Sequence, residues 1–344
     1  MFFDDASIYE NVDSTAYYKN LDDLPTQLVE IWKAFQIFPQ VKINNGETII
    51  FSGPQDFLDI VGIFSENIYL SHQLNVKTYS TEQLKYGFVP ANSLVVLFAP
   101  NLNQSMNDTL AAFTDLKCQT ILISRDEFKL VNQPSPVNFF RIPDNIRLDQ
   151  NLFALSTVIL FCVLEKTGFI NDAYGLIENL QTQAQTLIEK LGKNITTSHN
   201  PAKRLAGQMV DRLTVFACAE KLSGVARNWR SNFRNLAKTC VFVEVLYPSD
   251  SSSWNFVIYP ESVLSKTLFV FLKSTIVPGV SNQQVDLYHN HLLACGIGTD
   301  QVFAVGDNLL LHSWNLAIFG YFAAYYLAIA NKVDPAENFF PQEN

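Results

Sequence analysis

Residues 93–101 read Ser93-Leu94-Val95-Val96-Leu97-Phe98-Ala99-Pro100-Asn101, a continuous apolar run that ends in a turn. Similar short runs stand at residues 48–51, 119–124, 213–218 and 268–272, and residues 239–246 are also strand-like. These runs lack the strict apolar–polar alternation of a sheet with one face in water. Continuous apolar runs are typical of parallel strands that helices cover on both faces. The sequence therefore predicts the α/β class.

Helical periodicity separates these strands. Between residues 24 and 38, apolar side chains recur every three or four positions, which indicates an amphipathic helix. Further helices are expected at residues 107–116, 170–192, 201–210, 224–236 and 313–330. Two similar βαβ halves joined by the helix at 170–192 indicate a duplication, and two units are too few for a solenoid. The predicted organisation is an N-terminal segment and helix (1–39), a first domain (40–168), a connecting helix and linker (169–200) and a second domain (201–344).

Composition narrows the classes of function. The chain has 344 residues, of which 48% are hydrophobic, and 27 are phenylalanine. A single core rarely grows beyond about 250–300 residues, so two domains are expected. The 24 basic and 33 acidic residues give a net charge of −9, which argues against binding nucleic acid or an anionic membrane surface.

Cysteine usage and the apolar stretches indicate a cytoplasmic protein. Five cysteines stand singly and no CxxC pair occurs, as expected for reduced thiols rather than disulfides or a zinc site. The first residues show no basic and apolar regions of a signal peptide. The apolar stretches 152–164 and 314–330 are short for membrane spans and are expected to be buried helices.

Two loops after predicted strands could bind a ligand, because ligands of doubly wound sheets bind beyond the carboxyl ends of the strands. They are residues 52–56 and 100–105. Asn101, Asn103 and Ser105 could hold a phosphate or hydroxyl groups, or could simply form the turn and cap the next helix. Neither GxGxxG nor a P-loop pattern occurs, so no nucleotide cofactor is expected.

The paired histidines allow two interpretations. His289 and His291 are two residues apart, so on a strand they would share a face and could bind a metal. The alternative is a pair of polar side chains on a turn. Since no third ligand is evident nearby, neither a metal nor a cofactor is predicted.

The second half also carries longer sequence similarities. Residues 200–206 read NPAKRLA, residues 226–238 read ARNWRSNFRNLAK, and residues 320–335 read GYFAAYYLAIANKVDP. They resemble the segments NPAKxLA, AxRWKTQxNENAK and GDFVSYYLALLNGVDP of the bifunctional phosphoglucose/phosphomannose isomerases. Residues 93–112 resemble the family's TLVIAVSYSGNTEETLAAL, and Arg147 begins a segment similar to the start of the helix that closes the family's first domain. The resemblance implies two tandem sugar-isomerase (SIS) domains, each a three-layer α/β/α sandwich with a mainly parallel sheet.

The resemblance also implies site residues, and several of them differ from the family's pattern. The family's glutamate base corresponds to Asn235, which cannot accept a proton, and the ring-opening histidine corresponds most nearly to Ser251. Glu220, Glu244 or Asp250 could replace the base, and His289 or His291 the acid. The implied substrate-binding residues, with the sugar between the domains, are Gly53, Asn101, Asn103, Ser105 and Arg147.

Two functions follow as hypotheses. The first is a phosphosugar isomerase-like protein that interconverts glucose 6-phosphate or mannose 6-phosphate with fructose 6-phosphate, as the family does. The second is a catalytically inactive SIS module that binds a sugar phosphate as a sensor or supports an oligomer. The closing aromatic helix of such proteins commonly packs a dimer, so residues 314–326 are expected at the interface of a homodimer.

Overall fold

The computed structural model describes residues 2–38, 40–41, 48–72, 74–86, 89–90, 93–101, 118–126, 137–247, 259–276 and 279–337. The chain forms two compact units. Residues 24–181 form one of them, called the five-strand unit below. Residues 1–23 and 182–344 form the other, the four-strand unit. The domain limits inferred from the sequence remain a prediction.

The five-strand unit is built on a parallel sheet of order β2-β1-β3-β4-β5. Its strands are β1 (Thr48–Ser52), β2 (Asn75–Tyr79), β3 (Leu94–Phe98), β4 (Gln119–Ser124) and β5 (Val137–Arg141). Every residue of β1 and β3 is buried, which explains their unbroken apolar sequences. The described helices are α3 (Leu24–Ala34), α4 (Gln55–His72), α5 (Thr81–Tyr86), α7 (Leu148–Lys166) and the first half of α8 (Ala173–Leu191). Helix α7 packs against α3 and α4, and its stretch 152–164 is a buried helix as predicted.

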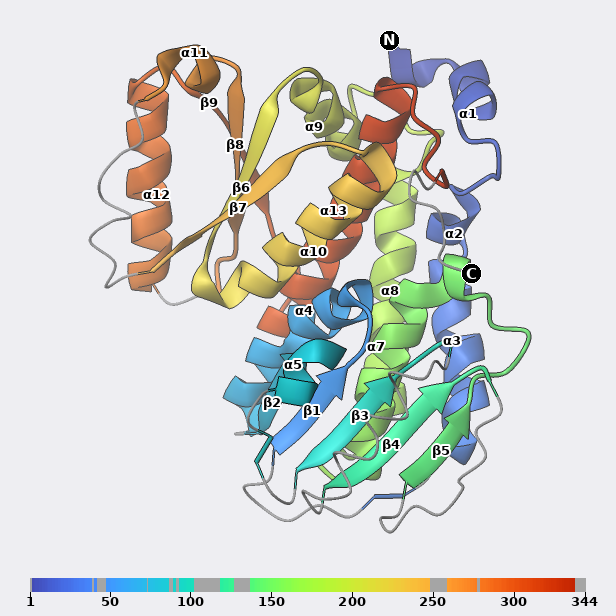
Figure 1. Ribbon diagram of the computed structural model, residues 1–344. Coiled ribbons are helices and arrows are strands. Elements are labelled where there is room, and N and C mark those ends of the chain that lie inside the picture. The colour runs from blue at the N-terminus through green and yellow to red at the C-terminus, as the bar shows by residue number, and fades with distance from the viewer. Residues whose placement is uncertain are drawn as a thin grey trace. The chain divides into compact units, whose positions relative to one another are not determined.

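The four-strand unit repeats this plan with the parallel order β7-β6-β8-β9 (Figure 1). Its strands are β6 (Leu213–Ala219), β7 (Val241–Leu246), β8 (Thr267–Lys273) and β9 (Gly298–Phe303). Helices α10 (Ser223–Ala237) and α13 (Leu309–Ala330) cover one face, and α12 (Gly279–Ala294) covers the other. Both units therefore place their first strand between the second and third, in agreement with the predicted duplication and the three-layer α/β/α fold.

Smaller elements complete the two units. The N-terminal segment carries η1 (Phe2–Asp4), α1 (Ala6–Val12) and α2 (Lys19–Asp22), and η1 and α1 contact α13. The remaining described elements are η2 (Phe35–Ile37), α9 (Pro201–Met209), η3 (Glu220–Leu222) and α11 (Glu261–Leu264). The predicted helix at 107–116 lies outside the described residues.

Helix α13 is the apolar centre of the four-strand unit. Among the described residues, α13 is the helix that is long and apolar enough to cross a membrane. However, 83% of its most apolar 18-residue stretch is buried inside the protein. The side chains of Trp314, Tyr325 and Tyr326 have no exposed surface. These three side chains belong to the core of one chain, while Phe319 and Tyr321 of the same stretch are partly exposed, so the interface expected at residues 314–326 stays a prediction. The homodimer itself remains a prediction.

Candidate functional site

Three of the predicted binding residues lie at one edge of the five-strand sheet, where the carboxyl ends of its strands are aligned. Gly53 follows β1, Asn101 follows β3, and Arg147 is the N-cap of α7. Strand order reverses direction between β1 and β3, and such a switch point is where open parallel sheets bind ligands. The other two predicted binding residues, Asn103 and Ser105, lie outside the described residues.

Gly53 permits a close approach between the ends of β1 and β3. A Cβ atom at this position would lie 2.7 Å from the carbonyl oxygen of Phe98 and 3.2 Å from the ring of Phe57. Phe57 is fully buried, and its ring centroid lies 4.7 Å from that of Phe98. A side chain at Gly53 would therefore push the ends of β1 and β3 apart. The glycine allows these two strand ends to pack directly against each other and against the ring of Phe57.

Replacing Gly53 with alanine should lower the free energy of unfolding by about 1–3 kcal/mol, the usual cost of overfilling a packed site. Urea unfolding followed by circular dichroism measures this change. Gly62→Ala is the matched control, because Gly62 lies within α4 and a Cβ there would meet no atom within 4 Å. The control should be neutral or up to about 1 kcal/mol more stable, as expected for glycine to alanine in a helix. Equal stability of the two variants would contradict the close approach.

Two further arginines, which the sequence analysis missed, stand at the same edge. Arg125 follows β4, and its backbone N–H donates to the carbonyl of Pro100 at 3.3 Å. Arg141 ends β5, and its Nε donates to the carbonyl of Arg125 at 3.3 Å. Arg125 also donates through Nη2 to the carbonyl of Ile146, beside the start of α7. These bonds join the ends of β3, β4, β5 and α7 at one edge, where the guanidinium of Arg141 also pairs with Asp144 at 2.9 Å.

Two polar atoms at this edge are buried without a hydrogen-bond partner among the described residues. They are Nε of Arg125 and the hydroxyl oxygen of Ser52, the last residue of β1. Leaving such a group unpaired costs about 1–3 kcal/mol, and more for a charged group. A phosphate oxygen is a strong acceptor for a guanidinium N–H. The edge can therefore bind an anion that also offers hydroxyl groups to Ser52 and Asn101.

The catalytic candidates of the second half are not brought together. Asn235 is exposed near the end of α10, on one face of the four-strand sheet, whereas His289 and His291 lie on α12 across the sheet (Figure 1). Of the alternative bases, Glu220 follows β6 and Glu244 lies within β7. Ser251 and Asp250 lie outside the described residues.

The two histidines lie on a helix, and neither the strand nor the turn considered for them is correct. Residues two apart on a helix point to different sides, because each residue turns the helix by about 100°. His289 Nε2 lies 2.9 Å from the side-chain nitrogen of Gln301, while His291 Nε2 lies 3.3 Å from the sulfur of Cys295. Among the described residues, no group of three or more His, Cys, Asp or Glu could hold a metal ion.

The cysteines fit the sequence interpretation. All five are free thiols, and Cys118, Cys162 and Cys218 are buried. Burial raises the pKa of Cys162 and of Cys218 to about 12, so both remain protonated at neutral pH. These two thiols are packing groups and not nucleophiles.

Comparisons with known proteins agree with this fold. Residues 198–338 match the family model of the bacterial phospho-glucose isomerase C-terminal SIS domain. A glucose-6-phosphate isomerase like protein from Thermus thermophilus is similar in structure, with a TM-score of 0.53, 16% identity, and 97% of this chain and 94% of that chain covered. No curated protein sequence matches the chain.

Two enzymes of other sugar phosphates are also similar in structure. Tagatose-6-phosphate ketose/aldose isomerase from Escherichia coli gives a TM-score of 0.66 at 10% identity, with 94% of this chain and 96% of that chain covered. Glucosamine-6-phosphate deaminase from Thermotoga maritima gives a TM-score of 0.60 at 14% identity, with 92% of this chain and 96% of that chain covered. At these identities the likeness establishes the SIS-type fold and leaves the reaction open.

Proposed function

We propose that this protein binds a hexose phosphate at the carboxyl edge of the five-strand sheet. The observation that carries the proposal is the buried Nε of Arg125, which has no partner among the described residues. The match to an SIS domain model and the likeness to proteins of phosphosugar chemistry support this ligand class.

The edge suits a phosphorylated sugar in two ways. Arg125 and Arg147 supply positive charge, and helix α7 directs its N-terminus, with its partial positive charge, to the same edge. Ser52 and Asn101 supply groups that can bond to sugar hydroxyls. The phosphate would thus account for most of the affinity, and the hydroxyl contacts would select the sugar.

Of the two functions, we favour a module that binds a hexose phosphate without converting it. Aldose–ketose isomerisation needs a base that moves a proton between two neighbouring carbons and an acid that opens the ring. The family's base position is Asn235, which cannot accept a proton, and His289 lies on the opposite face of the sheet. We infer a cytoplasmic protein, since its cysteines are unpaired. The homodimer rests on the resemblance alone.

Isomerase activity on glucose 6-phosphate or mannose 6-phosphate is the second candidate. The observation that favours it is the SIS domain model matched by residues 198–338, which belongs to a phospho-glucose isomerase. Glu220, placed directly after β6, is the described carboxylate best situated to replace the missing base, because it stands at the carboxyl edge of the second sheet.

Isothermal titration with glucose 6-phosphate, mannose 6-phosphate and fructose 6-phosphate tests the proposal. We expect at least one of them to bind, and unphosphorylated glucose to bind much more weakly. Arg125→Gln should weaken binding about tenfold or more, the factor that follows from losing one charge-assisted hydrogen bond. Arg212→Gln is the control, because Arg212 precedes β6 in the other unit.

A turnover assay on the same samples separates the two candidates. Binding without conversion of glucose 6-phosphate to fructose 6-phosphate supports the binding module. Conversion that is lost in Glu220→Gln supports the isomerase. No heat and no thermal shift with all three sugar phosphates would refute both.

A further inference from the structure

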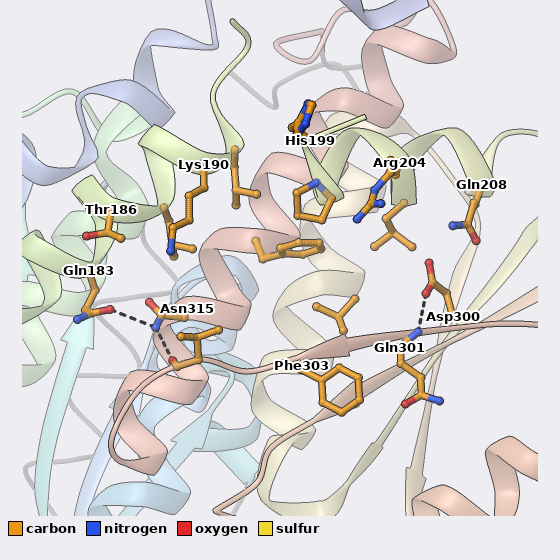
Figure 2. A pocket seen from close by; sticks show the side chains of 17 residues that line it. Gln183, Thr186, Lys190, His199, Arg204, Gln208, Asp300, Gln301, Phe303 and Asn315 are labelled. Carbon is orange, nitrogen blue, oxygen red and sulfur yellow. Dashed lines mark hydrogen bonds between the residues drawn. The ribbon is translucent and has the colours of Figure 1, made fainter. Parts of the chain in front are cut away.

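A groove of about 700 Å³ lies beside the free edge of the four-strand sheet (Figure 2). Its walls come from the second half of α8, from α9, from α13 and from strand β9. Four consecutive residues of β9, residues 300–303, line it. Successive side chains of a strand point to opposite faces, so a cavity touched by four in a row lies against the strand's edge. In the five-strand unit, the corresponding side of β4 is covered by β5.

Asn315 lines this groove and carries an unpaired acceptor. The residue is only 4% exposed, and its Nδ2 donates to the carbonyl of Val305 and to the side-chain oxygen of Gln183 at 3.4 Å. These two bonds fix the orientation of the amide, so the acceptor Oδ1 is the atom of the amide that is left. Oδ1 is buried and has no hydrogen-bond partner among the described residues. A ligand that donates an N–H or O–H would satisfy it.

Three basic residues surround the groove. Lys190 lies in the last turn of α8, His199 precedes α9, and Arg204 lies on α9. In Figure 2, Lys190 extends from α8 and Arg204 from α9. The described part of the chain contains no ion pair for any of the three. The acidic residue in the lining, Asp300, offsets only one of the two positive charges of Lys190 and Arg204, so the lining keeps a net positive charge. The groove therefore attracts anions.

The remaining walls are apolar. Leu187 and Leu205 line the groove from the two helices, and the ring of Phe319 lines it from α13. On the strand side, Phe303 is 57% exposed and Val305 is 62% exposed, although both are large and apolar. A volume of this size is typical of small-molecule sites, in which apolar walls surround a few polar groups.

We propose that this groove binds a small apolar acid, that is, an aromatic or aliphatic body with one anionic group and one N–H or O–H donor. The anion pairs with Lys190 and Arg204, the donor bonds to Asn315 Oδ1, and the body lies against Phe303 and Phe319. This site is separate from the sheet edge proposed for the hexose phosphate, and neither proposal depends on the other.

The probe 8-anilinonaphthalene-1-sulfonate tests the proposal, because it combines aromatic rings, a sulfonate and one N–H. We expect saturable fluorescence enhancement with one site per chain in the full-length protein. The double variant Lys190→Gln/Arg204→Gln should weaken binding about tenfold or more. Leu187→Trp should abolish it by filling the groove. The neutral analogue N-phenyl-1-naphthylamine lacks the sulfonate, so its affinity should be the same in the wild-type protein and in the double variant.

Three controls show whether a change in binding of the probe comes from the groove. Lys266→Gln/Arg230→Gln removes the same charge from the four-strand unit outside the groove and should leave the dissociation constant of the probe unchanged. Circular dichroism melting curves show whether each variant is folded. Arg125→Gln, which tests the hexose phosphate, should not alter binding of the probe. Equal affinity of the wild-type protein, the groove double variant and Leu187→Trp would overturn the proposal.

Discussion

Replacing Lys203 with methionine should lower the free energy of unfolding by about 3–5 kcal/mol, because hydrogen bonds to a charged group contribute about 1.5–3 kcal/mol each and at least two would be lost without replacement. The side chain of Lys203 has no exposed surface. Its ammonium donates to the carbonyls of Phe3, Lys193 and Ile195 at 3.1, 2.7 and 2.7 Å, and lies 4.0 Å from the carboxylate of Asp4. Methionine has a similar length but donates nothing, so the carbonyls of Lys193 and Ile195 would lose this donor, while the carbonyl of Phe3 would keep its bond from the Tyr9 hydroxyl at 2.9 Å.

Urea unfolding followed by tryptophan fluorescence measures the loss. Lys266→Met is the matched control, because Lys266 is exposed in a turn, and its effect should stay within about 0.5 kcal/mol. Burial lowers the pKa of Lys203, and the nearby Asp4 opposes that shift. Equal stability of Lys203→Met and Lys266→Met would show that the three carbonyl bonds contribute nothing net.

This lysine also explains what the similarity at residues 200–206 means. Asn200 caps α9, because its side-chain oxygen accepts from the N–H groups of Ala202 at 3.0 Å and Lys203 at 3.1 Å. Its side-chain nitrogen donates to the carbonyl of Leu191 at 2.7 Å. The motif that most resembles the sugar isomerases therefore joins α8, α9 and the N-terminal segment. Similarity at this motif reports on the fold and not on the reaction.

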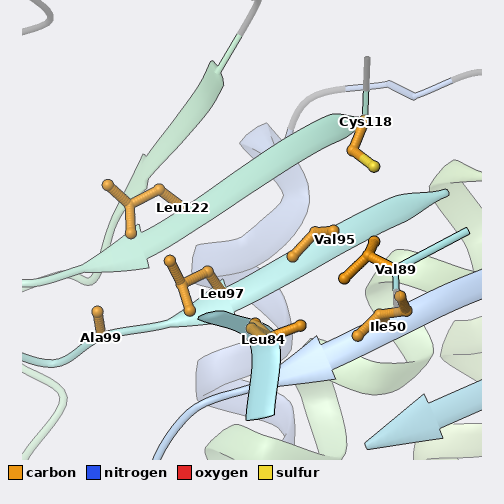
Figure 3. Close-up of a cluster of buried hydrophobic side chains, with 8 residues drawn as sticks. All are labelled: Ile50, Leu84, Val89, Val95, Leu97, Ala99, Cys118 and Leu122. Carbon is orange, nitrogen blue, oxygen red and sulfur yellow. The ribbon is translucent and has the colours of Figure 1, made fainter. Parts of the chain in front are cut away.

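The strands buried on both faces could be predicted from the sequence, and so could the partly exposed β7, but three other partly exposed strands could not. Figure 3 shows Ile50, Val95, Leu97 and Leu122 from three neighbouring strands in one buried cluster with Leu84 of α5. Such positions require apolar side chains, so the strands read as unbroken apolar runs. Strands β2, β5 and β9 are partly exposed and include polar residues, so their sequences do not differ clearly from those of loops.

The candidate site could be predicted only where sequence order determines position. Gly53 and Asn101 follow predicted parallel strands, so their place at the carboxyl edge follows from the topology alone. Arg125 also follows a predicted strand by one residue, and that spacing was the available signal for it. Asn235 and His289 lie on two helices, α10 and α12. Packing decides which face of the sheet each helix covers, and the sequence contains no local signal for that choice.

The groove beside β9 could not be predicted at all. It depends on β9 being the edge strand of the sheet formed by the described residues, and β9 itself gives no clear strand signal. Asn315 lies within an apolar helix, where a single asparagine is easily taken for a tolerated polar residue. Its unpaired oxygen becomes evident only from the hydrogen bonds of its nitrogen.

Replacing Trp229 with alanine should also lower the free energy of unfolding by about 3–5 kcal/mol, the usual cost of removing a buried aromatic side chain. Trp229 is fully buried, and its ring centroid lies 5.2 Å from that of Phe216 and 5.9 Å from that of Phe319. Its Nε1 donates to the carbonyl of Leu316 within α13 at 2.8 Å. Gly320 makes this bond possible, because a Cβ atom there would lie 2.2 Å from Nε1.

Gly320 should therefore respond to substitution in opposite directions in two backgrounds. With Trp229 present, Gly320→Ala displaces the indole and should destabilise the protein by about 1–3 kcal/mol, the usual cost of overfilling a core. In the Trp229→Ala background the space is empty, and alanine should stabilise the helix by up to about 1 kcal/mol relative to glycine. A double-mutant cycle in urea measures this coupling. Two side chains that compete for one space cannot act independently. Additive effects of the two substitutions would therefore show that the position of the Trp229 indole does not require a glycine at residue 320.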